Sequence, residues 1–109
     1  MQESEFNQLA ETTMVDIEEA IEQSDADIDY DTISDILTLE FENGSKIIIN
    51  KQAPLSQLWV ATKIGGFHFN YDAEEETWCL DKDHSRQLFK CLSEYCSVQA
   101  GETVELIQP

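Results

Sequence analysis

Carboxylates are concentrated near the start of the chain, in the segment IEEAIEQSDADIDYD at residues 17–31. Seven of its fifteen residues are aspartate or glutamate, none is basic, and the aspartates at 25, 27, 29 and 31 occupy every second position. Carboxylate oxygens without cysteine or histidine are the ligands that hard cations prefer. This chemistry selects Fe³⁺ by charge, Ca²⁺ and Mg²⁺ by ligand type, and Fe²⁺, Mn²⁺ and Co²⁺ more weakly.

The spacing of these aspartates indicates several shallow sites rather than one cage. Alternate side chains on a strand lie about 6.6 Å apart, which is too far for a compact octahedral site. Crowded carboxylates also hold protons more tightly, so we expect cation binding to weaken as the pH falls. The run DADID matches the first ligand positions of an EF-hand loop. Tyr30 at the glycine position and Ile36 at the bidentate-glutamate position exclude that motif.

The charge of the whole chain narrows the choice of partner. It has 23 acidic and 6 basic residues, and the first basic residue is Lys46. Such a field repels nucleic-acid phosphates and anionic lipid surfaces, so we expect no nucleic-acid and no membrane partner. It attracts cations and proteins with a basic patch. An acidic decoy, which mimics nucleic acid and occupies a DNA-binding protein, is an alternative function compatible with the same charge.

A helix is predicted over residues 3–22, and it would position the first carboxylates. Its apolar positions recur at steps of three and four and share one face. They are Phe6, Leu9, Ala10, Met14, Ile17 and Ile21. At about 100° per residue, Glu11, Glu18 and Glu22 fall within an arc of about 40°, with Glu19 beside them. The helix therefore has a core stripe and a row of glutamates.

An antiparallel meander is predicted after this helix. The alternating aspartates form an extended entry to it, and Asn43-Gly44 is a strong hairpin signal. The strands are expected at residues 36–41, 45–50, 57–62, 67–71 and 77–81. A second helix is expected to begin at 83–85 and to end at Ala100-Gly101. The order helix, meander, helix predicts one α+β domain over 1–109, a two-layer sandwich with both terminal helices on one face of the antiparallel sheet.

The exposed face of this sheet carries a tryptophan among amides. Alternation sends Ile47, Ile49, Leu58 and Val60 inward, and it therefore sends their neighbours outward. The outward residues are Asn50, Gln52, Gln57 and Trp59. An exposed tryptophan among amides is typical of a binding hot spot. The other interpretation is that Trp59 only covers a neighbouring strand.

The remaining residues do not favour an enzyme. The chain has no nucleophile motif, phosphate-binding loop or HExxH sequence, and no Glu-x-x-His arrangement that a di-iron ferroxidase would need. Cys79, Cys91 and Cys96 are an odd number without CxxC, which favours a reducing compartment over disulfides. We expect no structural zinc site. No apolar run suggests a membrane span and the N-terminus lacks a secretory pattern, so we expect a cytoplasmic protein.

The segment FENGSKIIINKQAPLSQLWVATKIGGFHFNY resembles the signature segment of the frataxin family. The similarity extends from SEFNQLA near the start to QAGETVEL near the end, and it is strongest with the bacterial CyaY branch. The resemblance implies a non-enzymatic, monomeric iron-binding protein that regulates iron–sulfur cluster assembly. It implies docking on the cysteine desulfurase IscS, which the protein would inhibit or supply with iron, and contact with the iron–sulfur scaffold protein. Metal-driven oligomers are an alternative that the sequence leaves open.

The resemblance also assigns residues. The family's iron-binding ridge falls on Glu18, Glu19, Glu22, Asp25, Asp27, Asp29 and Asp31, and helical geometry adds Glu11. We call these eight residues the acidic ridge. It is expected to bind Fe²⁺ and Fe³⁺ weakly at several sites, where other divalent or trivalent cations would substitute. Contact with IscS and the scaffold is expected through Glu18, Glu19, Glu22, Asn50, Gln52, Gln57 and Trp59.

Overall fold

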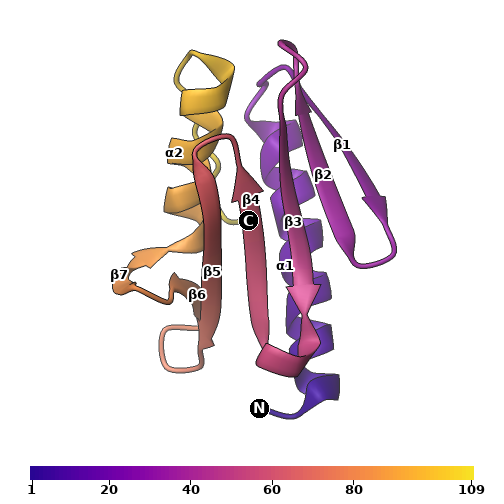
Figure 1. Cartoon of the computed structure of the whole chain (residues 1–109), viewed down its shortest axis with the longest axis vertical. Helices are drawn as coiled ribbons and strands as arrows, with labels where there is room; N and C mark the ends of the chain where they lie inside the picture. The colour runs from indigo at the N-terminus through magenta and orange to yellow at the C-terminus, as the bar shows by residue number, and fades with distance from the viewer.

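The structure is a computed structural model that describes all 109 residues. Its elements are α1 (Glu3–Gln23), β1 (Ile28–Ile33), β2 (Ile36–Phe41), β3 (Lys46–Gln52), the 3-10 turn η1 (Ala53–Leu55), β4 (Gln57–Thr62), β5 (Gly65–Asp72), β6 (Thr77–Leu80), β7 (Asp83–Gln87) and α2 (Leu88–Ala100). The strands form one sheet in sequential order, and each neighbouring pair is antiparallel. Both helices lie behind this sheet in Figure 1. The predicted two-layer α+β sandwich is confirmed.

Helix α1 follows the apolar period of its sequence. Phe6, Ala10 and Ile17, on the predicted core stripe, are completely buried against the sheet. The helix ends because Asp25 adopts a left-handed backbone conformation, with φ of 59°. The Ser24 hydroxyl donates a hydrogen bond to a carbonyl of the last turn at 2.7 Å, which satisfies one of the free helix-end acceptors. This stop fixes where the chain turns from the helix into the sheet.

The core lies between the two layers and follows the predicted alternation. The fully buried strand residues are Leu37, Leu39, Ile47, Ile49, Leu58 and Phe69. Trp78 of β6 is 3% exposed, and its ring meets Phe6 of α1 edge-on with centroids 5.9 Å apart. Its Nε1 donates to the Thr13 hydroxyl at 2.8 Å. Trp78 therefore fastens the ridge-bearing helix to the sheet by both packing and a hydrogen bond.

The predicted start of the second helix is wrong. Residues 83–87 form strand β7, which pairs with β6 through Cys79↔Gln87 and Leu80↔Asp83, and α2 begins only at Leu88. Asp83 accepts hydrogen bonds from the Ser85 backbone and hydroxyl, a local pattern that resembles a helix cap in sequence. The predicted end is confirmed, because Gly101 takes a left-handed φ of 74° just after the helix.

One consequence of this core is a pH dependence at the alkaline end. Cys96 is completely buried, and this burial raises the pKa of its thiol from 9.0 to about 12. Between these values the unfolded chain releases a proton that the folded protein keeps. The free energy of unfolding therefore loses about 1.4 kcal/mol per pH unit as the pH rises above 9. Below pH 9 this contribution is constant.

Urea unfolding at pH 8 and pH 10 would measure this effect. The loss of stability between the two pH values should be smaller in Cys96→Ala than in the unsubstituted protein. Comparing the two pH values within each variant removes the constant effect of the missing side-chain atom. Equal losses in both proteins would contradict the assignment to Cys96.

Candidate metal-binding and docking surfaces

The helical part of the acidic ridge lies against the edge strand β1. The hydroxyl of Thr32 donates a hydrogen bond to the Glu18 carboxylate, and that of Tyr30 donates to Glu22. The bond to Glu22, followed by partial burial, raises the pKa of Tyr30 to about 12. These two contacts orient the glutamates along the junction of helix and strand. Glu18 is half-buried, whereas Glu19 and Glu22 are exposed.

The aspartates of the acidic ridge occupy different positions from one another. Strand β1 begins only at Ile28, so Asp25 and Asp27 lie in the turn after α1 rather than on an extended entry. Asp29 and Asp31 are on β1, opposite Glu40 and Thr38, and they point away from the helices because alternate residues face α1. The acidic ridge therefore wraps around the edge of the sheet, with its glutamates on the helical side and two aspartates on the outer side.

Seven members of the acidic ridge have no basic partner. No ion pair shorter than 4.0 Å involves any of these seven residues. The eighth member, Glu11, does form an ion pair. The Nζ of Lys51 lies 3.5 Å from Glu11 and 3.1 Å from Asp35, and the Lys51 side chain is only 7% exposed. Glu11 thus differs from the other seven in having its charge locally balanced. The sequence did not indicate this, because Lys51 is forty positions away from Glu11.

The seven unpaired carboxylates offer oxygen ligands at separate points. No three of them bring ligand atoms within 4.8 Å of one another. A hard cation at this surface would therefore keep much of its water shell or draw exposed side chains together. This geometry suits weak, exchangeable binding more than a preformed site.

The predicted outward residues of β3 and β4 lie on the outer face of the sheet. Asn50 pairs with Trp59 in the sheet register, and Gln52 pairs with Gln57. Gln52 donates to Asn50 at 3.1 Å, and the indole Nε1 of Trp59 donates to Gln57 at 2.8 Å. We call these four residues the amide–tryptophan face. Their placement is confirmed, and their role in binding stays a prediction.

Trp59 also covers a neighbouring strand, as the second interpretation expected. Its ring stacks on His68 of β5, with centroids 4.3 Å apart and an interplanar angle of 10°. Gln57 reaches the same strand by donating to Asn70 at 3.1 Å. The face is therefore held by hydrogen bonds within β3 and within β4 and by stacking and a hydrogen bond between β4 and β5, which favours a preorganised surface.

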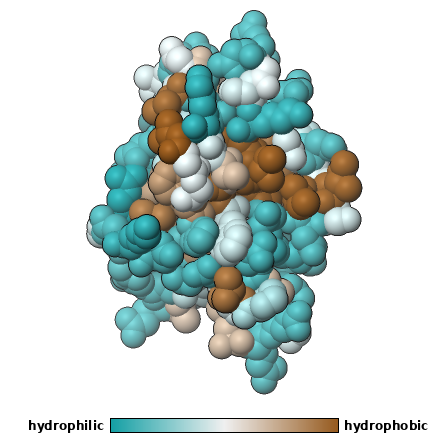
Figure 2. Space-filling view, in the orientation of Figure 1, coloured by the Kyte–Doolittle hydropathy of each residue, from teal (hydrophilic) through white to brown (hydrophobic).

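An exposed apolar strip lies between the two polar surfaces. Ile33, Ile36 and Ile48 are 67%, 43% and 37% exposed, and Ile36 pairs with Ile33 on one side and Asn50 on the other. Figure 2 shows apolar side chains from the β1–β2 hairpin across the outer face. We call these residues the isoleucine strip. The sequence pattern did not single out this strip, although the three consecutive isoleucines of β3 place Ile48 outward.

The chain is similar to proteins of one family over nearly its whole length. Residues 1–102 match the family model described as a frataxin-like domain. Among solved structures, a frataxin from Psychromonas ingrahamii, used to study stability modulation within the CyaY protein family, is 44% identical. The match covers 99% of this chain and 100% of that one, with a TM-score of 0.89. Neither helix of the structure is both long and apolar enough to cross a membrane.

Proposed function

The chain belongs to the frataxin family, in its CyaY branch, and from this premise we propose that it binds iron and regulates iron–sulfur cluster assembly. Family membership supports a role in iron–sulfur metabolism. In our proposal, the acidic ridge holds Fe²⁺ and Fe³⁺ weakly at several sites and also docks on IscS. The protein acts in the cytoplasm as a monomer without catalysing a reaction.

The observation that supports this proposal most is the set of seven carboxylates without a basic partner. Like charges at this density destabilise the folded state, and a cation or a basic protein surface relieves the repulsion. Because iron and IscS would use the same carboxylates, binding of one changes the affinity for the other. Iron would therefore modulate the docking of the protein on IscS.

The outer face supplies the other half of the proposed docking surface. The isoleucine strip gives apolar area next to the acidic ridge, and the amide–tryptophan face gives an aromatic anchor with hydrogen-bonding groups. Interfaces combine such apolar and aromatic centres with charged rims. In our proposal, the acidic ridge forms the charged rim that contacts IscS. The amide–tryptophan face contacts the scaffold protein.

NMR titrations of the backbone amides test this assignment. Anaerobic titration with Fe²⁺ and a separate titration with IscS should both perturb the amides of residues 18–31. IscS should also perturb the amides of Ile36 and Ile48 by direct contact, and iron should affect these two amides less than it affects residues 18–31. Perturbation by Fe²⁺ at other parts of the surface, with residues 18–31 unaffected, would refute the proposed site.

Metal binding to the folded state should raise the melting temperature. A cation present at a hundred times its dissociation constant stabilises the folded state by about 2.7 kcal/mol per site. For a domain of this size, that corresponds to an increase of roughly 10 °C. Monovalent salt should give a smaller increase by screening alone.

The matched control is the variant Glu18→Gln, Glu19→Gln, Glu22→Gln and Asp29→Asn, in which the same side chains become neutral. Its melting temperature should respond much less to Fe²⁺ and to salt. Calorimetric scans of both proteins at saturating metal would decide. A melting temperature unchanged by metal in the unsubstituted protein would count against binding at the acidic ridge.

A further inference from the structure

A second group of ligands, chemically different from the acidic ridge, lies near the other edge of the sheet. Asp72 ends β5, Cys79 lies in β6 and His84 lies in β7. One ligand atom from each of the three lies within 4.8 Å of the other two. Because the strands are ordered from β1 to β7, this group and the acidic ridge are at opposite ends of the sheet (Figure 1).

An irregularity in the sheet helps to assemble this group. Cys79 pairs with Gln87, whereas the next residue, Leu80, pairs with Asp83, so the register shifts between Cys79 and Leu80. A bulge of this kind redirects the side chains near it. The alternation of side chains in β6 directs Cys79 to the outer face of the sheet. Cys79 is nevertheless only 2% exposed and lies outside the hydrophobic core cluster. Its thiol is thus covered on the outer side, where Asp72 and His84 lie.

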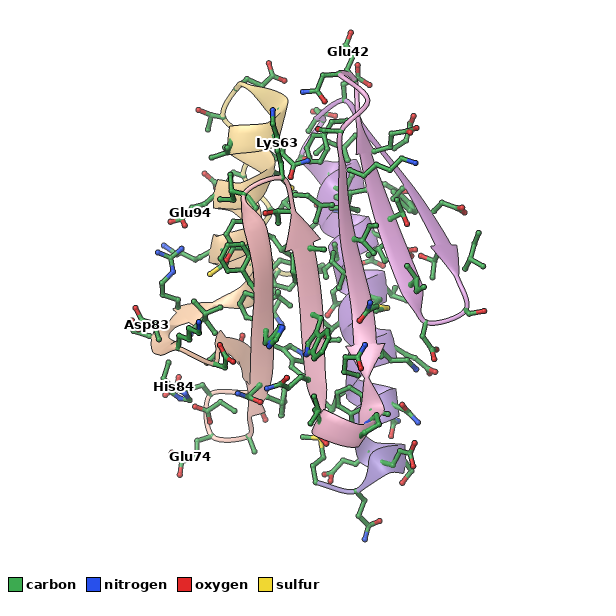
Figure 3. The ribbon with its side chains drawn as sticks, viewed as in Figure 1. Glu42, Lys63, Glu74, Asp83, His84 and Glu94 are labelled. Atoms are coloured by element: carbon green, nitrogen blue, oxygen red, sulfur yellow. The ribbon has the colours of Figure 1, made fainter.

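The Asp72 carboxylate is held in a fixed orientation. One oxygen, Oδ1, accepts the backbone N–H groups of Glu74 at 2.9 Å and Glu75 at 3.2 Å. The other oxygen, Oδ2, lies 2.6 Å from His84 Nε2. Backbone hydrogen bonds such as the two to Oδ1 orient metal-binding carboxylates in proteins, and here they direct Oδ2 toward His84. Figure 3 shows His84 beside the β5–β6 turn that carries Glu74.

We propose that Asp72, Cys79 and His84 form a binding site for a divalent cation of the Zn²⁺ and Co²⁺ class. Sulfur, imidazole nitrogen and carboxylate oxygen together favour such borderline cations over Ca²⁺ and Mg²⁺. Three protein ligands leave the fourth tetrahedral position to water, and the 74% exposed His84 side chain leaves the site open to solvent. Binding releases the Cys79 proton, because the thiolate is the ligand.

The geometry requires only small movements. Around a tetrahedral Zn²⁺, ligand atoms are separated by about 3.3–3.6 Å. The Asp72–His84 pair at 2.6 Å would have to separate slightly, and the Cys79 sulfur would have to stay within reach. The exposed ring of His84 provides this freedom, while Asp72 and Cys79 are fixed by their strands. A bound cation would tie β7 to β5 and β6.

This site differs from the acidic ridge in a way that an experiment can resolve. Only the site at β5–β7 contains sulfur, and a thiolate bound to Co²⁺ produces a charge-transfer band in the near ultraviolet. Tag-free, reduced protein titrated with Co²⁺ should develop this band, and added Zn²⁺ should abolish it. The band should be absent in Cys79→Ser. The variant His84→Gln loses one of the three protein ligands and should bind Co²⁺ at least about tenfold more weakly, since loss of an outer hydrogen-bond partner alone costs about 10–100-fold.

Two controls separate this proposal from the function of the acidic ridge. The first control, His68→Gln, removes the other histidine. The second, Glu19→Gln with Asp29→Asn, removes two ridge carboxylates. Both proteins should keep the charge-transfer band and bind Co²⁺ at this site with unchanged affinity. The exposed position of His84 keeps its variant foldable, so the proposal is decided even if Cys79→Ser does not fold. A titration without the band, or one that is the same in His84→Gln as in the unsubstituted protein, would overturn it.

Discussion

Charge reversal of the three ridge glutamates on α1, in the variant Glu18→Lys, Glu19→Lys and Glu22→Lys, should weaken IscS binding by at least about 100-fold. Close charge pairs across interfaces are coupled by about 1.5 kcal/mol or more. Three charge reversals at one contact should therefore reduce the binding free energy by several kcal/mol, and every 1.4 kcal/mol is tenfold in affinity. Iron uptake should fall with it, because ammonium groups replace oxygen ligands and repel the cation.

The variant should remain folded, which makes the loss of binding interpretable. Glu19 and Glu22 are exposed and Glu18 is half-buried at the surface. The hydrogen bonds from Thr32 and Tyr30 would be lost, at roughly 1 kcal/mol each, while the repulsion within the acidic ridge decreases. Circular dichroism would confirm the fold. Binding is measured by calorimetry at two salt concentrations, and inhibition by the desulfurase rate.

The chain contains a matched control for total charge. Three consecutive exposed glutamates, Glu74, Glu75 and Glu76, form the β5–β6 turn far from β1. Reversing these three residues to lysine changes the net charge equally but should leave IscS affinity within a few-fold of that of the unsubstituted protein. If both triple variants lose affinity to the same extent, net charge rather than the acidic ridge controls docking. That result would favour a non-specific acidic decoy.

The architecture could be predicted because each buried element has a clear hydrophobic period. Leu37, Leu39, Ile47 and Ile49 alternate, and Phe6 belongs to a stripe with helical spacing, so their burial follows from local order. Strand β7 could not be predicted in this way. Its residues DHSRQ are polar and mostly exposed, so pairing with the edge of β6, rather than burial, makes it a strand.

For the candidate sites too, prediction from the sequence worked for residues close together in the chain and failed for contacts between distant ones. The residues of the acidic ridge and of the amide–tryptophan face are close in sequence, so helical spacing and strand alternation predicted much of their placement, and the family resemblance assigned the proposed iron-binding role. Asp25 and Asp27 are the exception, because they lie in the turn before β1. The pairing of Lys51 with Glu11 and the convergence of Asp72, Cys79 and His84 depend on strand register. The sequence gives no period for such contacts, because a one-residue shift in register would separate the groups.

Truncation of Phe6 should cause the largest loss of stability from a single substitution among those considered. Phe6 is completely buried between α1 and the sheet, and its ring meets Trp78 edge-on. Phe6→Ala should lower the free energy of unfolding by about 3–5 kcal/mol through lost burial and the cavity left behind. Since domains of this kind are stable by only about 5–15 kcal/mol, this is a large share of the total.

The same variant tests whether the stability of the fold and the binding of iron depend on different residues. Phe6 lies on the buried face of the helix that carries the ridge glutamates and supplies none of the proposed ligands, so folded Phe6→Ala at low temperature should still bind iron. Val15→Ala, at a 51% exposed position of the same helix, should change stability by less than about 0.5 kcal/mol. Urea unfolding measures both variants. A change below 1 kcal/mol in Phe6→Ala would mean that α1 is held to the sheet by other contacts.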